Sequence, residues 1–174
     1  MGDVLLLTGR PGSGKTTVVR RLAEAFPGRV GGFYTEELRE SGQRVGFVLV
    51  TLAGQRAVFA HVAWKQHPHR VGRYGVDLQV LEATGVPAVR QAVQARQAVL
   101  VDELGKMELL SPTFRQVVEE AADSPAPLVA TVLLGSHPWA DGFRRRPRVT
   151  QVVVSPANRE EVFRFSESWL RGRL

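Results

Sequence analysis

The chain has 174 residues, 44% of them hydrophobic and 23% charged, a balance that predicts one globular domain spanning residues 1–174. Cysteine is absent, which excludes disulfide bonds, thiol catalysis and cysteine-based zinc sites. No apolar run approaches the roughly 20 residues of a membrane span or forms a signal peptide, so we expect a cytoplasmic protein without membrane association. The net charge of +6 is carried mostly by scattered arginines, which favours an ion-paired surface over a nucleic-acid-binding stripe.

The first predicted strand, residues 1–8, carries a continuous apolar run, which indicates burial on both faces of a parallel sheet. The glycine-rich loop that follows fits the pattern G-x-x-x-x-G-K-[ST] of phosphate-binding loops, and a helical pattern comes after it. Glycines let backbone N–H groups approach a triphosphate, and the helix adds its positive dipole end. We expect the following residues to bind a nucleotide: Gly9, Arg10, Pro11, Gly12, Ser13, Gly14, Lys15, Thr16 and Thr17.

Two side chains of this loop have specific expected roles. Lys15 can reach the β- and γ-phosphates as a point charge, which makes it a candidate catalytic residue, and the Thr16 hydroxyl is a candidate Mg²⁺ ligand. Thr17 is expected to support the start of the helix and not the metal. The helix itself is predicted over residues 15–26, before Pro27 and Gly28.

Residues 29–62 predict an antiparallel meander of three strands, 31–39, 44–52 and 56–62, separated by short turns. Residues 63–76 are predicted to form a loop. His61, just before this loop, and His67 and His69 within it lack the spacing and the carboxylate neighbours of a metal site, so we interpret them as exposed loop histidines. Two helices are expected next, over 78–83 and 87–95, separated at residues 84–85.

Residues 98–103 form the second informative stretch, because four apolar residues run directly into two acids. This pattern predicts a buried strand whose carboxyl end carries Asp102 and Glu103. Ligands of open α/β sheets lie outside the carboxyl ends of the strands, so the acids are expected near the phosphate-binding loop. Asp102 is then a Mg²⁺ ligand, directly or through a water, and Glu103 the general base that activates the attacking water.

The remaining elements complete a mostly parallel α/β domain. A helix is expected from Pro112, with Ser111 as its N-cap, followed by a strand over 127–134. Residues 135–148 are predicted as a loop and 149–154 as the last strand. The closing helix is expected over 158–170, with Val162, Phe163 and Trp169 in the core.

Five segments, 9–17, 32–39, 70–77, 102–109 and 158–159, together resemble the small thermostable, or cancer-related, nucleoside-triphosphatases. The block Asp-Glu-Leu-Gly-Lys-Met-Glu-Leu at 102–109 is the most specific of them. The resemblance implies a single-domain enzyme with a three-layer P-loop NTPase fold that hydrolyses ATP, GTP, CTP, UTP and other nucleoside 5′-triphosphates to diphosphate and phosphate, with Mg²⁺ as cofactor. It also implies that a second segment forms part of the nucleotide site: Val99, Leu100, Val101, Asp102, Glu103, Leu104, Gly105 and Lys106. We expect the enzyme to be a monomer.

Three features leave alternatives open. Lys106 is either a second positive charge at the phosphates, and so a candidate catalytic residue, or a surface lysine. Glu36 and Arg39 either line the site or form a cross-strand ion pair. The arginine-rich run 144–148 is a lid over a transferred phosphate, a charge-stabilising finger or plain surface.

Two other functions compete with hydrolysis. A phosphotransferase, such as a nucleotide or polynucleotide kinase, is supported by the arginine run 144–148, whereas Glu103 counts against it because kinases rarely need to activate water. A nucleotide-driven module that binds RNA or DNA is supported by the net charge alone. The chain lacks the Asn-Lys-x-Asp signal that reads guanine, so hydrolysis is expected to show low base specificity.

Overall fold

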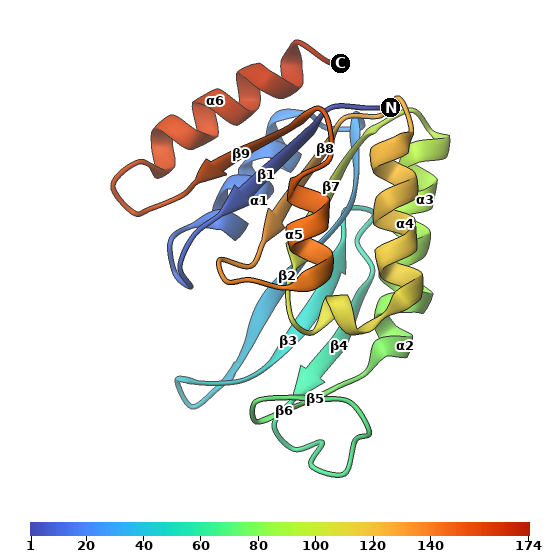
Figure 1. The fold of residues 1–174 in the computed structure, drawn as a ribbon. Coiled ribbons are helices and arrows are strands. Elements are labelled where there is room, and N and C mark those ends of the chain that lie inside the picture. Colours follow the sequence, from blue (N-terminus) through green and yellow to red (C-terminus); the bar gives the residue numbers. More distant parts are fainter.

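The computed structural model describes residues 1–174, which form one nine-stranded mixed sheet (Figure 1). Its order is β5-β6-β4-β3-β2-β7-β8-β1-β9, and the neighbours from β2 to β9 run parallel while those from β5 to β2 run antiparallel. The strands are β1 (Val4–Thr8), β2 (Val30–Glu40), β3 (Gln43–Thr51), β4 (Arg56–His61), β5 (Arg70–Val71), β6 (Tyr74–Val76), β7 (Ala98–Leu104), β8 (Leu128–Val132) and β9 (Val149–Val153).

Helices cover both faces of this sheet (Figure 1). They are α1 (Lys15–Ala25), α2 (Leu78–Val80), the π-helical turn η1 (Leu81–Gly85), α3 (Val86–Gln94), the 3₁₀ turn η2 (Glu108–Leu110), α4 (Pro112–Asp123), α5 (Pro138–Arg144) and α6 (Arg159–Arg171). None of the helices combines the length and the apolar character that a bilayer crossing requires.

The three layers follow from the alternation of side chains along β1. Leu5 and Leu7 pack into a core shared with α1 and α6, whereas Val4 and Leu6 pack into a larger core shared with α3, α4 and α5. Both faces of the strand are therefore buried, as the continuous apolar run predicts. The predicted three-layer α/β fold is confirmed. The part of the sheet from β2 to β9 is parallel, and the antiparallel strands extend it beyond β2.

The predicted meander of β2, β3 and β4 is also confirmed, and it extends the main sheet. The first half of β2 pairs in parallel with β7, with Phe33 opposite Val101, and the second half pairs antiparallel with β3. Residues 63–76 are not entirely a loop, because β5 and β6 form a short hairpin on the outer edge of the sheet. Tyr74 anchors this hairpin, since it is buried and its hydroxyl accepts a hydrogen bond from Arg44 Nε at 2.9 Å.

Two helical segments differ from the sequence-based expectation. Residues 84–85 do not separate two helices, because helical backbone continues from α2 through η1 into α3. A Cβ atom at Gly85 would lie 3.1 Å from Leu81 Cδ1 and 3.2 Å from Phe33 Cε1, so this glycine permits close packing and does not end a helix. The predicted loop 135–148 contains α5, whose Ala140 and Phe143 are buried.

Candidate functional site

The glycine-rich loop connects the end of β1 to the start of α1, as predicted. Gly12 and Gly14 have φ values of 79° and 104°, which side-chain-bearing residues rarely adopt. A Cβ atom at Gly14 would lie 2.3 Å from Arg159 Cδ, whereas Gly12 has no neighbour within 4 Å and faces open space. The amides at the start of α1 therefore remain accessible to an anion.

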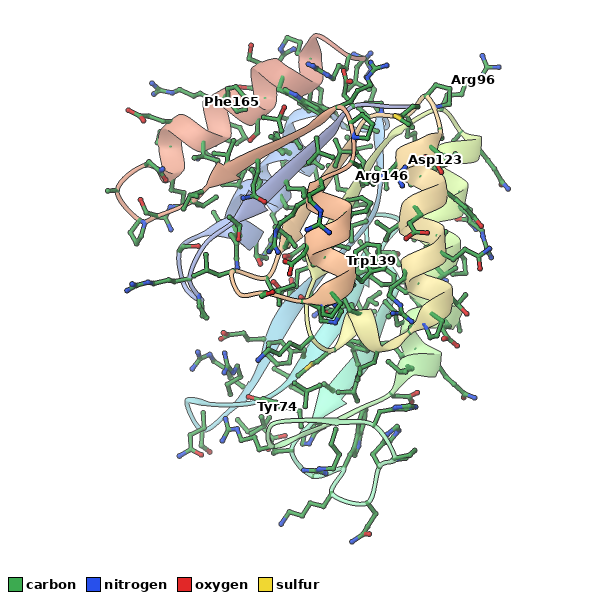
Figure 2. The ribbon with its side chains drawn as sticks, in the orientation of Figure 1. Tyr74, Arg96, Asp123, Trp139, Arg146 and Phe165 are labelled. Carbon is green, nitrogen blue, oxygen red and sulfur yellow. The ribbon has the colours of Figure 1, made fainter.

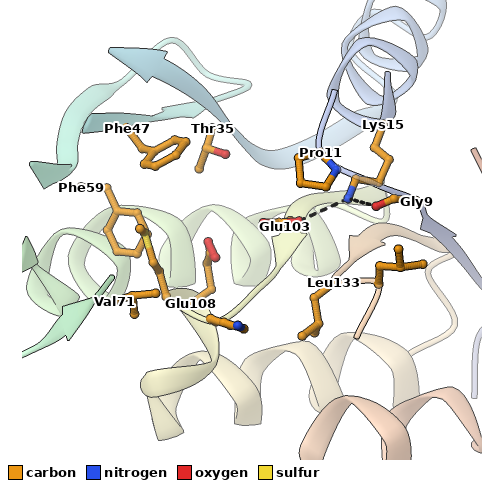
Figure 3. Close-up of a pocket in the computed structure, with 13 residues that line it drawn as sticks. Gly9, Pro11, Lys15, Thr35, Phe47, Phe59, Val71, Glu103, Glu108 and Leu133 are labelled. Atoms are coloured by element: carbon orange, nitrogen blue, oxygen red, sulfur yellow. Dashed lines mark hydrogen bonds and ion pairs between the residues drawn. The ribbon is translucent and has the colours of Figure 1, made fainter. Parts of the chain in front are cut away.

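Lys15 lies between this loop and the acids of β7. Its Nζ atom donates a hydrogen bond to the Gly9 carbonyl oxygen at 2.8 Å and lies 3.9 Å from Glu103 Oε2 (Figure 3). The side chain is only 13% exposed. The positive charge is therefore held at the mouth of the loop, next to a carboxylate from a segment that is remote in the sequence.

Asp102 is the structural link between the two predicted segments. It is 2% exposed, and its Oδ2 and Oδ1 atoms accept hydrogen bonds from Thr16 Oγ1 at 2.8 Å and from Thr131 Oγ1 at 2.6 Å. Burial raises the pKa of Asp102, and the hydrogen bonds from Thr131 and Thr16 act in the opposite direction. The carboxylate is thus fixed in position by hydroxyls from α1 and β8.

Glu103 follows Asp102 but has a different environment, because 36% of its side chain is exposed. Burial of its carboxyl group and the negative charge of Asp102 raise the pKa of Glu103, while the positive charge of Lys15 lowers it. A Cβ atom at Gly105 would lie 2.6 Å from Glu103 Oε1, so the glycine leaves room for this side chain. A carboxylate with a raised pKa at an accessible position suits proton transfer.

The other residues of the predicted site fall into three groups. Arg10, Pro11 and Thr17 are exposed around the loop, while Ser13 is buried and its hydroxyl has no hydrogen-bond partner. Four residues of β7 are wholly buried within the sheet and position the acids without facing a cavity: Val99, Leu100, Val101 and Leu104.

The structure gives different evidence on each residue whose role was left open. Lys106 is exposed at the rim of a cavity that Lys15 and Glu103 also line. Glu36 both lines a second cavity, on the loop side, and pairs with Arg56 at 2.8 Å. Arg39 instead pairs with Glu37 of its own strand at 2.7 Å and lines neither cavity.

Except for the exposed Arg145, the arginines of the run 144–148 are tied to the protein surface. Arg144 pairs with Asp141 at 2.7 Å, Arg148 pairs with Asp3, and Arg146, which follows α5, pairs with Asp123 at the end of α4 (Figure 2). Guanidinium groups engaged in this way do not extend over the phosphate-binding loop. This arrangement favours the surface interpretation over a lid or a finger.

Two cavities meet at Lys15. The loop-side cavity, about 590 Å³, is lined by no hydrophobic residue and includes Thr16 and Thr35. The other, about 270 Å³, runs from Gly9 and Lys15 past Glu103 towards β3 and β4 (Figure 3). The site can therefore accept an anion on the loop and a second small group beyond it.

Thr16 and Asp102 together offer oxygen donors to a divalent cation. No group of three or more His, Cys, Asp or Glu side chains gathers anywhere in the structure, and His61, His67 and His69 form none. A threonine hydroxyl and a carboxylate 2.8 Å apart are an incomplete donor set, which suits Mg²⁺ because this ion commonly uses one or two protein ligands with phosphate oxygens and waters.

Sequence reasoning missed three residues of the site. Thr131 is the single polar residue of the otherwise apolar strand β8, which is a usable signal. Glu108 is 4% exposed and lines the cavity beside Glu103, and its signal is an acid within the apolar run 107–110. Thr35 lines both cavities, and only the parallel pairing of β2 with β7 places it there.

Comparison with known proteins gives consistent matches over nearly the whole chain. Residues 4–165 match the family model described as NTPase. The nucleoside-triphosphatase THEP1 of Thermotoga sp. (strain RQ2) is 42% identical over 158 residues, which are 91% of this chain and 90% of that protein. The nucleoside-triphosphatase THEP1 of Methanothermobacter thermautotrophicus is 39% identical over 163 residues, 91% of each.

Solved structures agree with these matches. The crystal structure of THEP1 from Aquifex aeolicus has a TM-score of 0.87 at 34% identity and covers 96% of this chain and 98% of its own. The solution structure of a human cancer-related nucleoside triphosphatase has a TM-score of 0.84 at 32% identity, with 98% of both chains covered. The resemblance stated from the sequence is confirmed, and the chain belongs to the NTPase family of the THEP1 nucleoside-triphosphatases.

Proposed function

We propose that this protein hydrolyses nucleoside 5′-triphosphates to the diphosphate and phosphate, with Mg²⁺ and little preference for the base. The names of the THEP1 relatives support the reaction class. The observation that carries the proposal is the contact of Thr16 with Asp102, because residues 86 positions apart meet where a metal-bound triphosphate would lie.

The triphosphate would bind along the loop 9–16 through backbone amides and Lys15. The buried Ser13 hydroxyl supports this placement, because it has no partner within the protein and can donate to a phosphate oxygen. Thr16 and Asp102 would hold Mg²⁺, which supplies charge neutralisation at the β- and γ-phosphate oxygens.

Glu103 would accept a proton from the water that attacks the γ-phosphorus. Its raised pKa makes it a stronger base than an ordinary carboxylate, and Lys15 at 3.9 Å counters the negative charge that gathers there. The water oxygen forms a bond to phosphorus as the bond to the diphosphate oxygen breaks. The diphosphate leaves with that electron pair.

Low base specificity is supported by the surface next to the loop. Leu134 and Val153 are exposed there and line a cavity with Pro156 and the residues of the loop. An apolar wall contacts the face of any base without reading its polar edge, and such walls discriminate weakly between ligands.

Phosphate release from purified protein tests the proposal, with ATP, GTP, CTP and UTP each supplied with and without Mg²⁺. We expect release from all four, dependent on the metal and abolished in Lys15→Ala. Release no faster than that of Lys15→Ala would refute hydrolysis, and release from one triphosphate alone would refute the low specificity.

A further inference from the structure

The cavity beside Glu103 is larger than hydrolysis requires. Its volume is about 270 Å³, whereas one water occupies about 30 Å³ and a cavity of about 150 Å³ holds benzene. Lys15 and Glu103 line one end, and Phe47, Phe59 and Val71 line the other (Figure 3). The site of phosphate chemistry therefore continues into a space suited to an organic molecule.

Glu108 places an unused carboxyl group in the wall of this space, on the side towards the apolar end (Figure 3). It is 4% exposed and accepts hydrogen bonds from the backbone amides of Glu108 itself and Gly105, but no side chain donates a hydrogen bond to it or forms an ion pair with it. Burial and the neighbouring charge of Glu103 raise the pKa of Glu108 well above its usual value. A buried polar group without a side-chain partner suits a ligand that supplies one.

We propose that the cavity binds a small diol with an aromatic or branched aliphatic body, and that one hydroxyl of this diol accepts the γ-phosphoryl group in place of water. The apolar body contacts Phe47, Phe59 and Val71. The second hydroxyl hydrogen-bonds to Glu108, which fixes the position of the first hydroxyl beside Glu103.

The transfer uses the groups already assigned to hydrolysis, so this inference rests on the proposed function. The hydroxyl oxygen forms a bond to the γ-phosphorus, and its proton passes to Glu103. The bond between the γ-phosphorus and the diphosphate oxygen breaks, and the diphosphate leaves with the electron pair. The products are a phosphate monoester and a nucleoside diphosphate.

The probe is 1-phenyl-1,2-ethanediol, supplied with ATP and Mg²⁺, and ³¹P NMR measures the monoester and inorganic phosphate in the same sample. Their ratio reports the choice between alcohol and water and does not depend on the overall rate. We expect the rate of monoester formation to rise with diol concentration and to saturate, as it must if the diol fills a site. Benzyl alcohol, which lacks the second hydroxyl, should give a lower ratio.

Two variants locate the site. Val71→Phe narrows the apolar end and should lower the ratio about tenfold or more, whereas Val58→Phe makes the same change at an exposed position of β4 and should leave it unchanged. Glu108→Gln should lower the ratio for the diol more than for benzyl alcohol, which keeps the test open if Val71→Phe does not fold.

Each contrary outcome has a distinct meaning. Inorganic phosphate without monoester at every diol concentration would overturn the acceptor site while leaving hydrolysis intact. A rate of monoester formation that rises linearly with diol concentration without saturating, or a ratio that Val71→Phe does not change, would mean that the alcohol attacks from bulk solvent, which also overturns it. The absence of both products would instead refute the proposed function.

Discussion

The replacement Thr131→Val removes a hydroxyl that holds Asp102 in place and keeps the shape of the side chain. In the wild-type protein the hydroxyl donates to Asp102 Oδ1 at 2.6 Å, in a position with no exposed surface. The variant leaves that carboxylate oxygen without its partner. Because the lost hydrogen bond opposes the effect of burial, the pKa of Asp102 should rise further.

A hydrogen bond to a charged group contributes about 1.5–3 kcal/mol, and about 1.4 kcal/mol corresponds to a factor of ten in an equilibrium constant. If Asp102 binds Mg²⁺, the metal concentration that gives half-maximal hydrolysis should rise about 10- to 100-fold in Thr131→Val. The assay is phosphate release at saturating triphosphate, titrated with Mg²⁺.

Thr51→Val is the matched control, since Thr51 is also a buried strand threonine and its hydroxyl accepts a hydrogen bond from the Gln55 amide at 3.0 Å. It should lower the free energy of unfolding without changing the Mg²⁺ dependence. A Thr131→Val enzyme that titrates with Mg²⁺ like the wild type would refute the role of Asp102 as a metal ligand.

Two further predictions concern stability. Gly85→Ala should lower the free energy of unfolding in urea by about 1–3 kcal/mol, because the new methyl group crowds Leu81 and Phe33 in the core. Glu108→Gln should stabilise the protein increasingly as the pH rises above about 4.5, the ordinary pKa of a glutamate in the unfolded chain. The raised pKa of Glu108 means that the native state binds the proton more tightly than the unfolded chain does. The stability of the wild-type protein therefore falls as the pH rises towards the raised pKa, whereas that of the variant does not.

Their controls use the same substitutions at open positions. Gly54→Ala has no neighbouring atoms within 4 Å but a positive φ, so its cost should come from the backbone alone and not from repacking of the core. Glu24→Gln changes an exposed glutamate of α1 and should show no such growth with pH. A pH-independent effect of Glu108→Gln would contradict the raised pKa of the buried Glu108 carboxyl.

Local patterns carried most of the correct predictions. Strand β1 and the first four residues of β7 are apolar runs, and the glycines between β1 and α1 meet a steric requirement of the loop itself. Helix α4 begins where predicted because Ser111 accepts the Phe114 amide at 3.0 Å, an interaction that spans three residues. Such features depend on neighbours in the sequence, so the sequence alone displays them.

The misses depend on contacts between distant residues. Gly85 resembles a helix end until the packing of Phe33 and Leu81 against it is known. The partner of Asp102 on β8, Thr131, is determined by the strand order, which no local pattern specifies. Charge alone likewise could not show that Arg146 pairs with Asp123 at the end of α4.

The role of Glu103 as the base that activates water is the central claim, and Glu103→Gln tests it most directly when nucleotide binding and single-turnover hydrolysis are measured on the same preparation. The substitution keeps the size of the side chain and removes its ability to take a proton, so hydrolysis should slow by about a hundredfold or more. Binding of a non-hydrolysable triphosphate with Mg²⁺ should stay close to that of the wild type and of Glu161→Gln, an exposed control on α6. Equal losses of binding and rate, or a rate close to that of the wild type, would contradict this account.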